Sequence, residues 1–131
     1  ELEQTLSTAI SATLDGHPAA ANAAFEKLAM AGTAGISVLR SLQFEVRRML
    51  DAHVRIEEGQ ASPNMKLRPP VWQSEWPAYR ARLNKWPVRR LTRVLERIYE
   101  AESQAKRFGG STDAVVRVLM NDLARAAEAA R

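Results

Sequence analysis

The sequence contains no cysteine. This absence excludes disulfide bonds, cysteine-ligated zinc fingers and thiol nucleophiles, and it is compatible with a reducing cytoplasm. No apolar run approaches the ~20 residues that a membrane span needs, so we expect a cytoplasmic chain that makes no contact with a membrane. Aromatic residues make up only 6% of the chain, and runs of β-branched residues are nearly absent. A composition of this kind favours helices.

The chain has the length of one domain, at 131 residues, with a net charge of +4 and a pI near 10.0. A basic chain can attract an acidic partner, DNA included, although this excess is modest. The sequence begins without Met, on a helical pattern formed by Leu2, Leu6 and Ile10. We therefore expect a single helical domain over residues 1–131 that is a fragment of a longer chain.

Apolar residues recur at a spacing of three to four residues along most of the chain. Glycine, proline and turn-forming residues separate the periodic segments. The predicted helices cover residues 2–14, 18–31, 34–58 and 87–108, with a last helix capped by Ser111 or Thr112 and two short helical pieces around Pro77. The sequence therefore predicts an all-α, compact bundle of five to six helices. We expect two sub-halves, 1–58 and 69–131, joined by a loop over residues 59–68.

Residues 66–90 contain all three tryptophans and four of the six prolines. One interpretation is structural: Trp72, Trp76 and Trp86 bury their rings at helix junctions with each indole N–H bonded. The other interpretation is nucleic-acid binding, in which a basic ridge neutralises phosphates and the tryptophans stack on unpaired bases. That ridge would consist of Arg80, Arg82, Lys85, Arg89, Arg90 and Arg93. We favour structural anchors, because prolines beside the tryptophans indicate rings fixed by packing, and we keep a basic nucleic-acid-binding module as the alternative.

Phe44 falls in the middle of a charged helix face, together with Arg40, Arg47 and Arg48. An aromatic side chain among arginines is typical of the centre of a protein interface. These four residues are therefore a candidate subunit-interaction surface. The alternative is that residues 66–90 or the chain termini fold over Phe44.

The sequence offers no catalytic, cofactor-binding or metal-binding constellation. His17 lies in a predicted turn and His53 on an apolar helix face, and nothing at helical spacing completes a metal site around either. No phosphate-binding loop of the form GxxxxGK[ST] occurs. Pairs of carboxylates lie on predicted exposed faces. We expect no enzyme activity and no cofactor.

The order and spacing of these elements resemble the third domain of the delta subunit of bacterial DNA polymerase III. That family has a helix ending in a glycine turn, an alanine-rich helix, and a long helix with an LLRxL pattern. The matching positions are Gly16, Ala24, Leu28, Gly32, Ile36, Leu39, Arg40 and Leu42. Downstream, "RPPVW" is similar to the family's "PPVF", with Trp72 in the aromatic place. The segment "NKWPVRRLTRVLERIYEAESQAK" is similar to the next element, including Glu102 and Lys106. The departures are Phe44, where a polar residue is commoner, and a loose C-terminal helix.

The resemblance implies a function in assembly. Delta is the clamp-loader subunit that opens the sliding clamp, and its C-terminal domain packs with those of the other loader subunits in a helical collar. The implied partners are the gamma/tau and delta-prime subunits, whereas the sliding clamp and DNA are reached only through the intact complex. Delta has no working ATP site, and its clamp-binding elements belong to an N-terminal module outside this sequence. Polymerase activity would belong to the parent holoenzyme.

Overall fold

The structure, a computed structural model, describes residues 2–32, 35–108 and 112–130. Over these ranges the chain forms seven α-helices and no strand, which confirms the all-α class. The helices are α1 (Leu2–Asp15), α2 (Pro18–Met30), α3 (Gly35–Glu57), α4 (Pro63–Lys66), α5 (Trp76–Lys85), α6 (Val88–Phe108) and α7 (Thr112–Ala129). None of the helices in the described ranges combines the length and apolar character needed to cross a membrane. The expected count of five to six is not confirmed, since the four-residue α4 lies inside the expected loop 59–68.

The long helices begin and end within one residue of the expected positions wherever the structure describes them. Ala34 and Ser111, where two helices were expected to begin, lie outside the described residues. The expectation of two helical pieces around Pro77 is wrong. One helix, α5, carries Pro77 in its first turn, where a missing backbone N–H removes no helical hydrogen bond.

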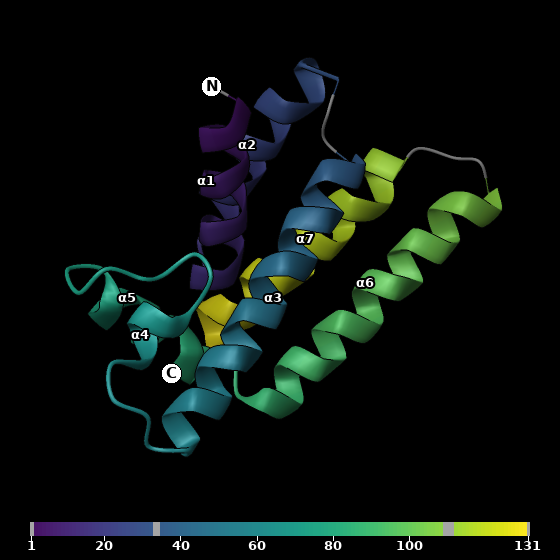
Figure 1. Cartoon of the computed structure of the whole chain (residues 1–131). Coiled ribbons are helices and arrows are strands. Elements are labelled where there is room, and N and C mark those ends of the chain that lie inside the picture. The colour runs from purple at the N-terminus through teal and green to yellow at the C-terminus, as the bar shows by residue number, and fades with distance from the viewer. Residues whose placement is uncertain (1, 33–34, 109–111, 131) are drawn as a thin grey trace.

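The helices form one interleaved bundle (Figure 1). α1 and α3 run in the same direction, with α2 returning between them in the sequence, and α6 lies on the side of α3 away from α1. α7 packs against α1, α2, α3 and α6. α7, which belongs to the expected sub-half 69–131, thus packs against the three long helices of the expected sub-half 1–58.

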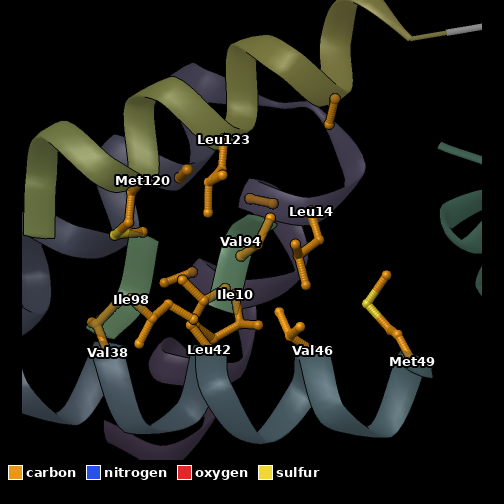
Figure 2. Packing of buried hydrophobic residues seen from close by; sticks show 14 of the residues in the cluster. Ile10, Leu14, Val38, Leu42, Val46, Met49, Val94, Ile98, Met120 and Leu123 are labelled. Atoms are coloured by element: carbon orange, nitrogen blue, oxygen red, sulfur yellow. The ribbon is translucent and has the colours of Figure 1, made fainter. Parts of the chain in front are cut away.

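The core is built along α3, whose apolar side chains point toward α1, α6 and α7 (Figure 2). The labelled members are Ile10, Leu14, Val38, Leu42, Val46, Met49, Val94, Ile98, Met120 and Leu123, and all of them are buried. Burying one such side chain contributes about 1.5–3 kcal/mol. The i+3 and i+4 pattern of α3 therefore identifies its buried face correctly, and this face determines which α3 residues remain outside.

Gly16 forms the turn between α1 and α2 and has a backbone φ of +89°. The backbone N–H of His17 donates a 2.8 Å hydrogen bond to the carbonyl oxygen of Ala12 across this turn, as in the usual glycine-terminated helix end. A Cβ atom at Gly16 would lie 2.7 Å from the backbone nitrogen of Glu128. Glycine is therefore required both by the left-handed backbone and by the close approach of α7.

Candidate functional site

An open groove with a volume of about 670 Å³ lies between α1, α3 and the α5 region. The face of α1 that lines it carries Glu3, Leu6, Ser7, Ile10, Ser11 and Asp15. The face of α3 that lines it carries Arg40, Ser41, Phe44, Glu45 and Arg48. The remaining lining comes from Val71, Glu75, Ala78, Tyr79 and Arg82. The groove thus brings together three segments that are distant in the sequence.

A buried carboxylate, Glu45, lies in this groove and is only 9% exposed. Its Oε2 accepts a 2.8 Å hydrogen bond from the hydroxyl of Tyr79 and a 3.4 Å bond from Nη1 of Arg82. Its Oε1 accepts a 2.9 Å bond from Nη1 of Arg48. Arg82 also binds Asp15 through two hydrogen bonds of 2.8 and 3.1 Å. Charges buried in this way are tolerated only when paired and hydrogen-bonded, and here each of them is.

The same network fixes the protonation states of its members. Burial raises the pKa of Tyr79, and the charge and hydrogen bond of Glu45 raise it further, against a smaller opposing effect of Arg48 and Arg82. For Arg82, burial lowers the pKa, but the hydrogen bond and charge of Asp15 and the charge of Glu45 outweigh it, so the pKa is raised. Tyr79 is therefore a neutral donor and Arg82 a cation at neutral pH. Among the described residues, no buried side-chain nitrogen or oxygen lacks a hydrogen-bond partner.

Phe44 stays on the surface at the edge of the groove, with 58% of its area exposed. Segment 66–90 reaches the groove through Val71 and Tyr79 but leaves the Phe44 ring mostly uncovered. The alternative, that this segment or a terminus folds over Phe44, is therefore not what the described residues show. Arg40, one turn before Phe44 on α3, is also exposed and lines the groove.

The other two arginines of the candidate interaction surface serve internal contacts. Arg48 donates from Nε to the carbonyl oxygen of Pro69 at 2.9 Å and from Nη2 to that of Pro70 at 3.4 Å, besides its bond to Glu45. Arg47 donates from Nη2 to the hydroxyl of Tyr99 on α6 at 2.8 Å. The structure therefore leaves Arg40 and Phe44 together at the groove. Arg48 instead binds the segment Pro69–Pro70, called the proline segment below, and Arg47 binds α6.

The predicted basic ridge is divided in the same way, because half of its residues bind other parts of the chain. Arg82 pairs with Asp15. Nζ of Lys85 donates to the carbonyl oxygen of Ala127 at 3.0 Å, and Nη1 of Arg90 donates to that of Lys85 at 2.8 Å.

These two cations lie beside the C-terminal end of α7. Lys85 also donates to the carbonyl oxygen of Ala130 at 3.3 Å, and Arg90 reaches that of Ala126 at 3.5 Å. Cations stabilise the C-terminal end of a helix. The members of the ridge that remain exposed are Arg80, Arg89 and Arg93. The ridge as predicted is therefore not a continuous free surface.

Trp86 is buried, with 2% of its area exposed. Its Nε1–H donates a 2.8 Å hydrogen bond to the carbonyl oxygen of Leu14, and its own carbonyl oxygen accepts a 2.8 Å hydrogen bond from Nε2 of His53. Trp76 is partly buried against the core and stacks on Tyr79 with ring centroids 5.8 Å apart. Both tryptophans occupy helix junctions, and His53 has a structural partner.

Trp72 is not an anchor, since it is 58% exposed and the expectation that it is buried is wrong. The preceding residue, Val71, is buried instead, and its N–H donates a 2.9 Å hydrogen bond to the carbonyl oxygen of Asn64. Nδ2 of Asn64 donates back to the carbonyl oxygen of Val71 at 2.8 Å. Successive side chains of an extended segment point to opposite sides, so burying Val71 turns Trp72 outward.

Sequence reasoning missed Glu45, Tyr79, Asp15 and Asn64. Each is a polar residue with at least one hydrogen-bond partner seven or more residues away in the sequence. Such a distant partner leaves no local pattern that distinguishes the residue from a solvated side chain. In the described ranges, no group of three or more histidine, aspartate or glutamate side chains is arranged to hold a metal ion. Comparison of the chain with protein-family models, curated proteins and solved structures gives no match.

Proposed function

We propose that this chain is an assembly domain of a DNA polymerase III clamp loader. In this proposal it packs with the C-terminal domains of the gamma/tau and delta-prime subunits in a helical collar, so that the complex can load the sliding clamp during DNA replication. The domain itself performs no catalysis and holds no cofactor, and it acts in the cytoplasm. The clamp and DNA are reached through the intact complex.

The observation that carries the proposal is Phe44. A large aromatic ring that is 58% exposed beside a groove is typical of a binding centre. Ile36 is 48% exposed, and Ile36, Arg40 and Phe44 follow one another at i+4 along α3. This row therefore presents apolar, cationic and aromatic side chains on one outward face.

The residues of the resemblance support the helical framework of the proposal. Ala24, Leu28, Leu39 and Leu42 are all buried, and Gly16 and Gly32 have positive φ. Most of the shared positions therefore serve folding. Ile36 and Arg40 are exposed, which makes them the shared positions of α3 that fit a contact with a partner.

The proposal is tested by mixing the chain with the C-terminal domains of the gamma/tau and delta-prime subunits and measuring mass by size-exclusion chromatography with light scattering. We expect a stoichiometric complex with a Kd of about 10 µM or tighter, which corresponds to at least ~7 kcal/mol of binding free energy. A mixture that elutes only as separate domains at concentrations well above this value would overturn the proposal.

A second candidate function, contact with single-stranded nucleic acid, is favoured by the exposure of Trp72. The ring follows Lys66 and Arg68, which are both exposed. An exposed aromatic side chain can stack on an unpaired base with about 1–3 kcal/mol, while cations bind the phosphates.

This second candidate is tested by fluorescence anisotropy with a labelled single-stranded oligonucleotide at two salt concentrations. Binding that weakens steeply with salt and drops about 5- to 150-fold in Trp72→Ala would support it. Phe44→Ala is the matched control, because Phe44 is also an aromatic residue with 58% exposure. The absence of binding at low salt would exclude the candidate.

A further inference from the structure

We propose that the groove between α1 and α3 receives an amphipathic helix of the partner protein and that charges at its rim orient this helix. The inference rests on the proposed assembly function and specifies the contact within it. Three properties of the groove support it: its length, the pairing of its buried charges, and the distribution of its exposed charges.

The groove has the dimensions of a short helix. Its α1 wall extends from Glu3 to Asp15, and 12 residues at 1.5 Å each give a length of about 18 Å, or roughly three turns. α1 and α3 run in the same direction (Figure 1) and form the two long walls. A helix that packs between two such walls places its side chains into the grooves between theirs.

The buried charges of the groove already have partners. Asp15 and Glu45 are bound by Arg82 and Arg48, and Tyr79 donates to Glu45. An ion or a small polar ligand would have to displace these hydrogen bonds, so its binding in the groove would gain little free energy. The apolar lining, in contrast, is open to further contact at Phe44, which is 58% exposed, and in part at Leu6, whereas Ile10 is buried in the core. Apolar residues at i, i+3 or i+4 and i+7 of a bound helix match such a strip.

The exposed charges have opposite signs on the two sides. Glu3 on α1 and Glu75 at the start of α5 are exposed carboxylates, whereas Arg40 on α3 is an exposed cation. Altogether four carboxylates and three arginines line the groove, in a chain whose net charge is +4. The complementary helix therefore has basic residues toward α1 and α5 and an acidic residue toward α3. Opposite charges of this kind fix orientation and exclude the reversed helix.

The test is a pair of serine-to-tryptophan variants, measured against the C-terminal domains of gamma/tau and delta-prime by calorimetry. Ser7 lines the groove and is exposed, so Ser7→Trp fills the groove without removing an internal contact of its own. Ser103→Trp is the matched control on the exposed surface of α6. We expect Ser7→Trp to weaken binding at least about tenfold and Ser103→Trp to change it less than about twofold. Circular dichroism and thermal unfolding check that both variants fold.

A charge reversal tests the orientation. Glu75→Lys is expected to weaken binding about fivefold or more, while Glu96→Lys, which reverses an exposed carboxylate on α6, has little effect. Equal effects of the two reversals would overturn the orienting role of the rim.

The outcomes separate this inference from the function on which it rests. If the wild-type chain binds the partner domains and Ser7→Trp binds equally well, the groove is not the contact, and the assembly function stands. If the wild-type chain does not bind them at all, both proposals are overturned. If the chain alone forms a dimer that Ser7→Trp dissociates, the groove is occupied by a second copy, and the inference of a partner helix is wrong.

Discussion

The hydroxyl of Tyr79 donates a 2.8 Å hydrogen bond to Oε2 of Glu45, a residue 34 positions earlier in the chain. The contact joins α5 to α3, and Arg48 and Arg82 extend it to the proline segment and to α1. The tryptophan-containing region is therefore attached to the bundle by a buried polar network in addition to its apolar contacts.

Replacing Tyr79 by Phe should lower the free energy of unfolding by about 1–3 kcal/mol, because a buried hydrogen bond to a charged acceptor is lost and Glu45 is left with fewer donors. Tyr99→Phe is the matched control, since that hydroxyl is bonded to Arg47 at the surface. The control should change stability by less than about 0.5 kcal/mol. Urea unfolding of both variants measures the difference, and equal losses would contradict the importance of the network.

The stability gained from Tyr79 should decrease at alkaline pH. The pKa of Tyr79 is raised in the folded chain, whereas the unfolded chain loses this proton near pH 10. The contribution is therefore complete below about pH 10 and is lost as the pH rises above that value. The difference in unfolding free energy between the wild type and Tyr79→Phe should be smaller at about pH 11 than at about pH 9. A difference that grows over this range would contradict the assignment.

The tryptophans should differ sharply in their contribution to stability. Trp86→Ala removes a buried ring and its hydrogen bond to Leu14 and should destabilise the chain by about 3–5 kcal/mol. Trp72→Ala removes an exposed ring and should change stability by less than about 1 kcal/mol. Thermal unfolding of the two variants compares them directly, and similar losses would show that Trp72 is buried in solution.

Alanine substitutions at Gly16 and Gly32 distinguish the stability cost of backbone strain from that of steric overlap. Gly16 and Gly32 both have positive φ, but a Cβ at Gly32 meets nothing within 4 Å, whereas at Gly16 it would overlap with the backbone of α7. Gly32→Ala should cost about 1–2 kcal/mol from the backbone alone. Gly16→Ala should cost at least about 1 kcal/mol more. Chemical denaturation of both variants tests this ranking, and a larger loss at Gly32 would contradict the close packing of α7.

Local patterns in the sequence were sufficient to predict α1, α2, α3, α6 and α7, whereas α4 was not expected and α5 was expected as two pieces. The spacing of Leu39, Leu42, Val46 and Met49 identifies the buried face of α3, and the same wheel places Phe44 outside. The end of α1 at Gly16 was predictable, because a left-handed glycine turn depends only on residues adjacent in the sequence. Periodicity reports which face is apolar, and this is why the all-α class was predictable.

The internal contacts of the charged residues Arg82 and Lys85 were not predictable, because their partners are distant in the sequence. Arg82 binds Asp15 across 67 residues and Lys85 binds the end of α7 across 42 residues. From their charge and position in the sequence alone, Arg82 and Lys85 were assigned to a basic surface. Trp72 was misjudged for a related reason, since the Asn64–Val71 pair that turns it outward depends on tertiary structure.

The most direct test of the assembly function is calorimetric titration of the gamma/tau and delta-prime C-terminal domains with the wild-type chain, Phe44→Ala and Trp72→Ala. The two aromatic residues are equally exposed, at 58%, so the variants remove comparable surface. We predict wild-type binding with a Kd of about 10 µM or tighter, a loss of at least about tenfold in Phe44→Ala, and no change in Trp72→Ala. Absence of wild-type binding, or unchanged binding by Phe44→Ala, would contradict the account.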